Sequence, residues 1–161
     1  MALREPFART AEGDVRLDVE PHEREALAHL AGEFRGLLTA RTPSSDPSLQ
    51  RLFPPAYPDD PLQNFDYERV AGAGLLADRL DGLDTVERTA GAERLSEDDL
   101  LTWMRVLNDI RLVVGSRLDI TEETSFEDFE GDEEGAGAFE LYGYLTWLVD
   151  AAVETLGDPT V

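Results

Sequence analysis

Residues 96–118 of the chain read SEDDLLTWMRVLNDIRLVVGSRL. Ser96 is a favoured helix N-cap residue, and the three acids that follow it would complement the positive end of a helix dipole. Apolar residues then recur at the spacing of one helical face. They are Leu100, Trp103, Met104, Leu107, Ile110, Val113 and Val114. We therefore predict a helix that runs to about Leu118, presents this face inward and forms the centre of the fold.

The same periodicity predicts a helix at each end of the chain. Pro21 is a favoured helix-starting residue, and residues 22–41 carry apolar side chains at helical spacing. The segment from about Phe139 to Leu156 repeats the pattern, and Gly157-Asp158-Pro159 would end it. The two inward faces would contain Leu27, Leu30, Phe34, Leu37 and Leu38 in the first helix, and Leu141, Tyr142, Leu145, Leu148, Val149, Ala152, Val153 and Leu156 in the last.

A further helical region is predicted between residues 64 and 89. One apolar stripe runs through it, formed by Val70, Leu75, Leu76, Leu80, Leu83 and Val86. Gly72, Gly74 and Gly82 interrupt the stripe, and each weakens a helix by up to ~1 kcal/mol relative to alanine. A kinked or two-piece helix is therefore expected here.

Two segments are not typical of helices. Residues 7–19 alternate apolar and polar side chains around Glu12-Gly13-Asp14, which predicts a short β-hairpin. The segment from Thr42 to Pro61 contains six prolines, which exclude a continuous helix. We expect a short helical turn there, followed by an ordered strap, RLFPPAYPDDP (residues 51–61), laid across the core.

Length and composition bound the fold class. The 161 residues suit one domain, and 42% hydrophobic residues are enough for a packed core. The expected fold is mainly α, with four to six helices in a single compact domain (1–161), a hairpin (7–19) and the proline-rich strap. The helical core would comprise residues 22–118 and 138–157, and a mobile acidic loop would occupy 119–137.

Charge and cysteine content limit the function. The formal net charge is −21, which disfavours direct binding to nucleic acid or to an anionic membrane surface. The sequence contains no cysteine, which excludes disulfides, thiolate metal sites, cysteine nucleophiles and thiol-based redox sensing. There is no signal-peptide pattern at the N-terminus and no long apolar run, so a cytoplasmic location is expected.

An acidic segment stands out in the C-terminal third. Nine acids and no base lie between residues 119 and 134. Within SFEDFEGDEE, Phe126 and Phe129 alternate with acids, a texture found in segments that dock on basic, apolar-lined surfaces. Either the phenylalanines fold back onto the helices of a solvated loop, or the segment binds a partner. Calcium binding is the least favoured alternative, because residues 128–132 lack the glycine position and the register of an EF-hand. The candidate partner-binding residues are Phe126, Asp128, Phe129, Glu130, Asp132 and Glu133.

A polar cluster interrupts the central apolar stretch, and it consists of Arg105, Asn108, Asp109 and Arg111. If these groups are buried, they must be paired, because an unpaired buried charge is costly. The cluster would either tie this helix to the strap or to the last helix, or form part of a docking face. Both alternatives remain open from the sequence.

The sequence contains no strong motif for catalysis or metal binding. His22, Glu25, His29 and Glu33 share one helical face and are the candidate metal ligands, but their spacing differs from that of HExxH. There is no glycine-rich phosphate loop and no GxSxG nucleophile motif. We therefore expect a protein that is not an enzyme and that carries neither a metal nor another cofactor.

Four blocks of sequence carry a family resemblance. They cover residues 23–38, the strap RLFPPAYPDDP, LNDIRLVVGSRLDIT (107–121) and YGYLTWLVDAAV (142–153). With these blocks the chain resembles the actinobacterial domain-of-unknown-function family twenty-seventeen, which includes the AosR-type oxidative-stress regulators. The resemblance implies a role in stress-responsive transcription through a protein partner, an alternative sigma factor. A thiol-based signal does not carry over, because this chain has no cysteine.

Two functional classes remain. The first is a regulatory or adaptor protein whose acidic surface binds a sigma factor or another basic transcription protein, with a rate raised by charge steering. The second is a homo-oligomeric structural or interaction protein, with a homodimer interface if the apolar faces of residues 103–118 and 139–156 exceed what one core covers. A metal-binding protein or an enzyme that uses the stripe of His22, Glu25, His29 and Glu33 is the least favoured alternative.

Overall fold

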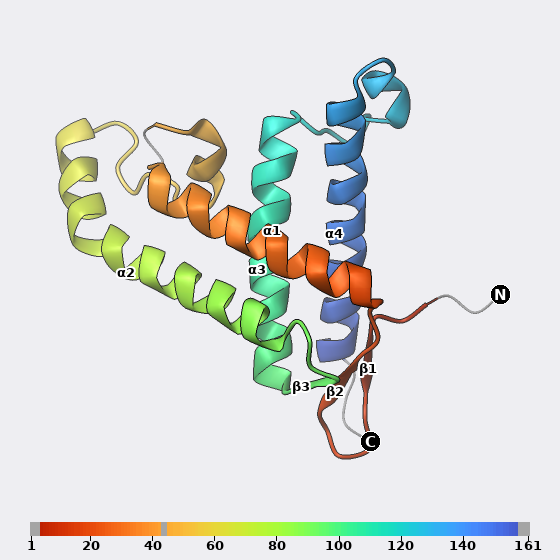
Figure 1. Cartoon of the computed structure of the whole chain (residues 1–161). Helices are drawn as coiled ribbons and strands as arrows, with labels where there is room; N and C mark the ends of the chain where they lie inside the picture. The colour runs from red at the N-terminus through yellow and green to blue at the C-terminus, as the bar shows by residue number, and fades with distance from the viewer. Residues whose placement is uncertain (1–3, 43–44, 158–161) are drawn as a thin grey trace.

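The computed structural model describes residues 4–42 and 45–157, and it confirms a mainly helical fold with a short β-sheet near the N-terminus (Figure 1). In chain order, the elements of this part are β1 (Phe7–Arg9), β2 (Val15–Leu17), α1 (Pro21–Ala40), the 3-10 helix η1 (Pro47–Arg51), α2 (Pro61–Thr89), β3 (Arg94–Leu95), α3 (Glu97–Arg117), the 3-10 helix η2 (Phe126–Phe129) and α4 (Glu133–Gly157). None of the described helices combines the length and the apolar composition needed to cross a bilayer.

Helix α3 is the central element, as predicted. It packs against α4 and against α2, and α2 packs in turn against α1. Its N-cap is Ser96, whose side chain accepts a hydrogen bond from the Asp99 backbone N–H at 3.0 Å. The predicted inward face is buried at five positions and half-buried at Met104 and Val114.

Trp103 joins three parts of the core. Its side chain is fully buried, and its indole Nε1 donates a hydrogen bond to Thr89 Oγ1 of α2 at 2.8 Å. The Phe7 ring of β1 meets the indole edge to face, with centroids 6.3 Å apart. The sheet, α2 and α3 therefore share one apolar core.

The predicted hairpin forms, and a third strand extends it. β2 pairs antiparallel with β1 and with β3, with Val15 opposite Leu95. β3 has two residues, too few to show an alternating pattern in sequence. The sheet is fastened to α1 by Arg24, whose guanidinium donates to four backbone carbonyls. The acceptors are Leu17 (2.7 Å), Val19 (2.9 Å), Ala90 (3.1 Å) and Ala92 (2.5 Å).

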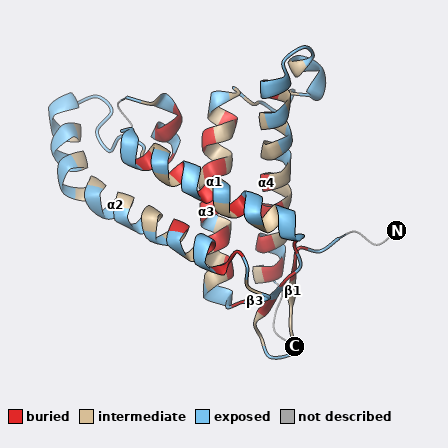
Figure 2. Cartoon of the chain, viewed as in Figure 1, coloured by how far each residue is buried: buried red, intermediate tan, exposed pale blue. Residues whose placement is uncertain are grey.

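Helix α2 is continuous from Pro61 to Thr89 and turns sharply in its first half (Figure 1), which agrees with the expected kink. The predicted apolar stripe is only partly right. Leu83 and Val86 are buried, whereas Val70 is 79% exposed. Leu62 and Phe65 are also exposed, at 81% and 64%. The first half of α2 extends away from the rest of the core (Figure 2), so several of its apolar side chains are exposed, although the Tyr67 ring meets the Tyr57 ring of the strap with centroids 6.2 Å apart.

The strap prediction needs correction. The helical turn is present as η1, which buries Leu49, and Leu52 after it is buried as well. Residues 54–60, in contrast, are all exposed, so only the start of the strap, at Leu52 and Phe53, lies against the core. With three prolines in these seven residues, the strap has few backbone donors for pairing with the core. Pro43, part of the same prediction, lies outside the described residues.

The boundary between the acidic loop and the last helix also differs from the prediction. α4 begins at Glu133 rather than near residue 138, because Asp132 Oδ1 accepts the Gly135 N–H at 2.9 Å and thereby caps it. Glu133 and Glu134 then lie in the first turn, where acids favour a helix. Residues 133–137, assigned to a mobile loop, are therefore helical.

The apolar surplus expected on α3 and α4 is found elsewhere. These two helices pack against each other and cover most of their own apolar faces, although Val153 of α4 remains exposed. Among the described residues, the other large exposed apolar side chains lie in the strap, the first half of α2 and η2. The homodimer interface predicted on α3 and α4 is therefore largely occupied by the intramolecular contact. Homodimer formation itself stays a prediction.

Candidate protein-binding surface

The acidic segment starts with a tight reversal after α3. Asp119 has a φ of 51°, a left-handed conformation that aspartate tolerates better than most residues, and the Ile120 N–H donates to the Gly115 carbonyl at 3.0 Å. This pair of features is typical of a helix C-terminus that turns back on itself. The following residues are thereby directed toward the start of α4.

Short side-chain caps then hold the segment together. The Thr121 N–H donates to Thr124 Oγ1 at 2.9 Å, and the Ser125 N–H donates to Asp128 Oδ2 at 2.9 Å in the capping box of η2. Asp132 caps α4 in the same way. Asp128 and Asp132, both predicted partner-binding residues, therefore also have structural roles.

Both phenylalanines of the segment fold back onto α4. The rings of Phe126 and Phe129 lie 4.8 Å and 5.2 Å from the ring of Phe139, the first edge to face and the second stacked. Phe126 nevertheless remains 57% exposed. The segment thus has the folded-back geometry of the first alternative and keeps an accessible aromatic edge, so partner binding through Phe126 stays a prediction.

The negative charge of this region is not neutralised within the chain. None of the ion pairs made by the described residues includes an acid from residues 119–134. Arg117 is the last basic residue of the sequence, and it pairs with Asp46 of the η1 region at 2.9 Å. The predicted partner-binding residues Glu130 and Glu133 belong to this segment, and both are exposed. The surface is therefore strongly attractive to cationic groups.

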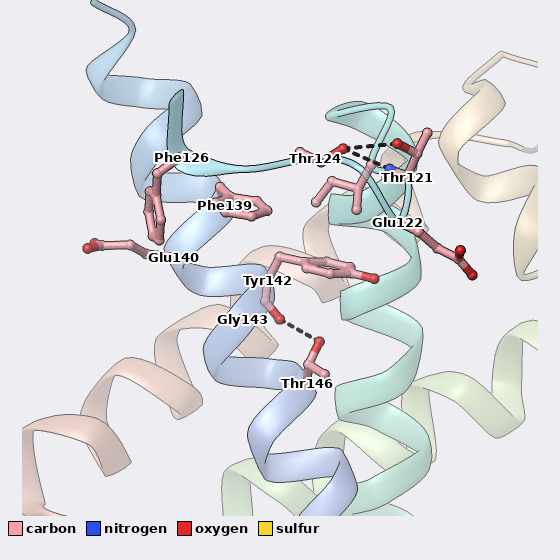
Figure 3. A pocket seen from close by; sticks show the side chains of 10 residues that line it. Thr121, Glu122, Thr124, Phe126, Phe139, Glu140, Tyr142, Gly143 and Thr146 are labelled. Carbon is pink, nitrogen blue, oxygen red and sulfur yellow. Dashed lines mark hydrogen bonds between the residues drawn. The ribbon is translucent and has the colours of Figure 1, made fainter. Parts of the chain in front are cut away.

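A groove lies between residues 120–126 and the start of α4, with a volume of about 730 Å³ (Figure 3). We call it the aromatic groove. Its aromatic side chains are Phe126, Phe139 and Tyr142, and Glu122 and Glu140 also line it. Tyr142 lies so close to α3 that a Cβ added to Gly115 would be 2.9 Å from the tyrosine ring. Glycine at residue 115 is thus what allows this ring to lie so close to α3.

The polar cluster of α3 mainly connects structural elements. Asp109 pairs with Arg79 of α2, with Oδ2 and Nη1 2.7 Å apart, rather than with Arg105 one turn before it. Arg79 also donates to the Leu52 carbonyl at 3.2 Å, which links α3, through α2, to the start of the strap. Burial raises the pKa of the Asp109 carboxyl to about 6, against the lowering effect of Arg79.

In the described part of the chain, the side chains of the other members of the cluster make no hydrogen bond or ion pair with those of Arg79 or Asp109. Arg111 Nη2 donates to Asn108 Oδ1 at 2.6 Å, and both residues are half-buried. Arg105 is exposed and lines the same cavity as Arg79 and Asp109. The four residues therefore do not form one continuous docking face, and a binding role for Arg105 stays a prediction.

The candidate metal ligands lie along the exposed side of α1. His29 Nε2 and Glu33 Oε1 are 3.4 Å apart, whereas Glu25 and His22 are exposed about one and two turns before His29. In the part of the chain that the structure describes, no three histidine, aspartate or glutamate side chains are close enough to hold a metal ion. The stripe therefore offers at most a two-residue contact.

The fold and this surface define an acidic, mainly helical protein with an aromatic groove. The chain belongs to the family described as a domain of unknown function (DUF2017), whose model matches residues 4–156, so the resemblance carried by the four sequence blocks is confirmed. It is 30% identical over 178 aligned positions to the oxidative stress regulator AosR of Mycobacterium tuberculosis (strain ATCC 25618 / H37Rv), covering 88% of this chain and 81% of that protein. It is 28% identical over 175 positions to the putative oxidative stress regulator AosR of Mycobacterium leprae (strain TN), covering 86% and 80%. No solved structure matches the chain significantly.

Sequence reasoning missed two features of this surface. The first is the groove, which depends on the contact between Tyr142 and Gly115 across two helices. The second is the set of hydrogen-bonded caps, for which Ser125 and Asp128 in the spacing S-x-x-D were an available signal. The acids of this segment are exposed and Phe129 is half-buried, and whether these residues bind a partner stays a prediction.

Proposed function

We propose that this chain is a non-enzymatic regulatory protein that acts in stress-responsive transcription by binding a basic protein partner. An alternative sigma factor is the first candidate for that partner. The observation that carries the proposal is the acidic surface of residues 119–134, which has no basic counterpart among the ion pairs of the described residues. The named regulators among its relatives support the regulatory role.

Electrostatics favour a protein partner over direct contact with DNA. The net charge of −21 repels phosphates, whereas an exposed acidic surface raises the association rate with a basic protein and makes the binding weaken with salt. The regulator therefore acts on transcription through the protein that it binds. It does so without any thiol chemistry, because the sequence has no cysteine.

The test is a binding measurement with purified components. The full chain is immobilised and exposed to the alternative sigma factors and the RNA polymerase core of its host, at low and at high salt. The test variant carries Glu123→Gln, Glu127→Gln, Glu130→Gln and Glu134→Gln, four exposed acids whose side chains make no ion pair in the described part of the chain.

A matched control variant removes the same charge elsewhere, with Asp18→Asn, Glu25→Gln, Asp59→Asn and Glu93→Gln. We expect salt-sensitive binding of one sigma factor, weakened roughly tenfold by the test variant and much less by the control, because each exposed charge contact contributes a few tenths of a kcal/mol. Absence of any transcription protein among the binders at low salt, or equal losses for both variants, would overturn the proposal.

A further inference from the structure

We infer that the aromatic groove is the docking site for a basic segment of the partner, which inserts one apolar side chain between Phe126 and Tyr142. This inference rests on the proposed function and specifies the chemistry of the partner. The acidic surface alone would attract any cationic protein. The groove adds a place where an apolar side chain can be recognised.

The walls of the groove are held in place before any partner arrives. Phe139 packs against both Phe126 and Phe129, at 4.8 Å and 5.2 Å between ring centroids. Tyr142 lies against Gly115 of α3, and Thr146 is fixed by its hydrogen bond to the Tyr142 carbonyl at 2.8 Å (Figure 3). A preformed groove of this kind binds an apolar side chain with little ordering cost.

The exposed edge of the Phe126 ring leaves apolar surface in the groove for a partner side chain to bury. The side chain is 57% exposed although its ring contacts Phe139. Burial of a partially exposed aromatic ring is a common source of affinity at protein interfaces. An incoming leucine, methionine or phenylalanine side chain would cover this edge.

The charges around the groove select a cationic segment. Figure 3 shows Glu140 beside Phe126 and Glu122 on the other side of the groove. Neither carboxylate takes part in an ion pair of the described residues. Arginine or lysine residues that flank the apolar side chain would therefore meet unpaired carboxylates on both sides. A second copy of this acidic chain would instead add repulsion.

The partner segment is accordingly an amphipathic helix or an extended strand with one apolar anchor between basic residues. This arrangement is a common mode of peptide recognition, in which the anchor supplies affinity and the flanking charges supply orientation and rate. The anchor is the part that distinguishes docking in the groove from general attraction to the acidic surface.

The direct probe is a fluorescent peptide of about twelve residues with a central leucine and two arginines on each side. The comparison peptide has serine in place of the leucine and the same charge. We expect the full chain to bind the leucine peptide about fivefold or more tightly than the serine peptide, because the serine peptide loses the apolar contact. Equal binding of the two peptides would overturn the inference.

A variant that fills the groove gives the second readout. Gly143 lines the groove in α4, and a Cβ added there would meet nothing within 4 Å. Gly143→Gln therefore projects a side chain into the groove while removing no native contact and replacing a weak helix former. We expect its melting temperature to be no lower than that of the native chain and its preference for the leucine peptide to be lost. Retention of that preference would contradict the inference.

Charge variants separate the electrostatic contribution to binding from the contribution of the apolar anchor. Glu122→Gln with Glu140→Gln should weaken both peptides, whereas Glu25→Gln with Asp59→Asn, which removes the same charge far along the chain, should leave both within about twofold. If the control pair weakens binding as much as the groove pair, docking in the groove is refuted.

The same variants distinguish failure of the inference from failure of the proposed function. A sigma factor that binds the native chain and Gly143→Gln equally well would refute docking in the groove and leave the regulatory function standing. Conversely, a leucine preference that Gly143→Gln abolishes, in a chain to which no transcription protein binds, would support the groove and overturn the proposed function.

Discussion

Arg24 connects more separate backbone segments than any other single side chain described above. Its guanidinium donates to carbonyls on β2, on the link between β2 and α1 and on the turn between α2 and β3. Arg24→Lys keeps the charge and loses the planar, multi-donor geometry, so several of these carbonyls lose their partner. We expect the free energy of unfolding to fall by about 2 to 3 kcal/mol, measured by urea denaturation.

Arg16→Lys is the matched control for this prediction. Arg16 is an exposed residue of β2 for which no side-chain hydrogen bond or ion pair is found in the described part of the chain. Its replacement should change stability by less than about 0.5 kcal/mol. Equal midpoints for the native chain and Arg24→Lys would show that water replaces the guanidinium contacts without loss.

At the residue scale, the raised pKa of the Asp109 carboxyl predicts an unusual pH dependence of the free energy of unfolding. Burial raises its pKa from 3.8 to about 6 in the folded chain, although Arg79 lies 2.7 Å away. Between these two values the folded chain holds a proton that the unfolded chain has lost. The contribution of Asp109 to stability is therefore fully present below pH ~4 and is lost as the pH rises through about 6.

Asp109→Asn makes this effect measurable. The free energy of unfolding of the native chain, minus that of the variant, should fall by up to about 3 kcal/mol between pH 4 and pH 7, since one pKa unit corresponds to ~1.4 kcal/mol. The carboxyls whose pKa values are lowered, such as that of Asp46 beside Ser48 and Arg117, are shared by both proteins and cancel in the difference. A difference that rises with pH would mean that the pairing with Arg79 outweighs burial.

At the scale of the element, α2 is divided into a structural half and an exposed half. Leu83 and Val86 are buried against the core, whereas Leu62, Phe65 and Val70 are largely exposed. Replacement of the last three by glutamine, together, should change the free energy of unfolding by no more than about 1 kcal/mol, because little apolar area returns to water. Thermal unfolding followed by circular dichroism measures this.

Leu83→Ala is the contrasting variant in the same helix. It removes a fully buried side chain and should cost about 2 to 5 kcal/mol. A comparable loss for the triple glutamine variant would show that the exposed half of α2 is covered in solution, by a second copy or by another part of the chain.

The helices and strands that could be predicted from sequence are those in which packing against a neighbour requires apolar residues at a regular spacing. α3 is recognisable because it is covered on two sides, so that its apolar positions and its Ser96 cap agree. β3 has only two residues, and its pairing with β2 depends on a contact across about eighty residues of chain. The first half of α2 shows the opposite case, because Val70 has the right period for a core that does not extend to it.

At the scale of the whole molecule, the residues of the candidate site could be predicted from the sequence, but the groove that they form could not. The acids of residues 119–134 and the two phenylalanines are visible in the sequence. The groove is not, because it arises where residues 120–126 pass the start of α4 and where Gly115 admits the ring of Tyr142. Such a close approach between helices leaves no periodic signal in either segment.

Because the sequence contains no cysteine, we predict that partner binding is not regulated by oxidation of a thiol. Partner binding should be the same after treatment with a thiol oxidant such as diamide and after reduction, within about 20% of the binding signal, because no thiol is available for a disulfide. The measurement is the binding assay with the sigma factor, in which only the regulator is treated before the reagent is removed. Loss of binding in the oxidised sample would point to oxidation of another residue type, for which half-buried Met104 is the candidate.

Net charge makes salt act in opposite directions on folding and on binding. With 35 acids against 14 bases, repulsion within the folded chain outweighs its exposed ion pairs, so screening by about 0.2 M NaCl should raise the melting temperature by roughly 2 to 4 °C. The same salt should weaken partner binding, because that contact joins opposite charges. The variant with four glutamines in residues 123–134 should show a smaller rise, since repulsion is concentrated there. A melting temperature that falls with NaCl would mean that the ion pairs of the described residues, such as Arg35 with Asp84, dominate over the net charge.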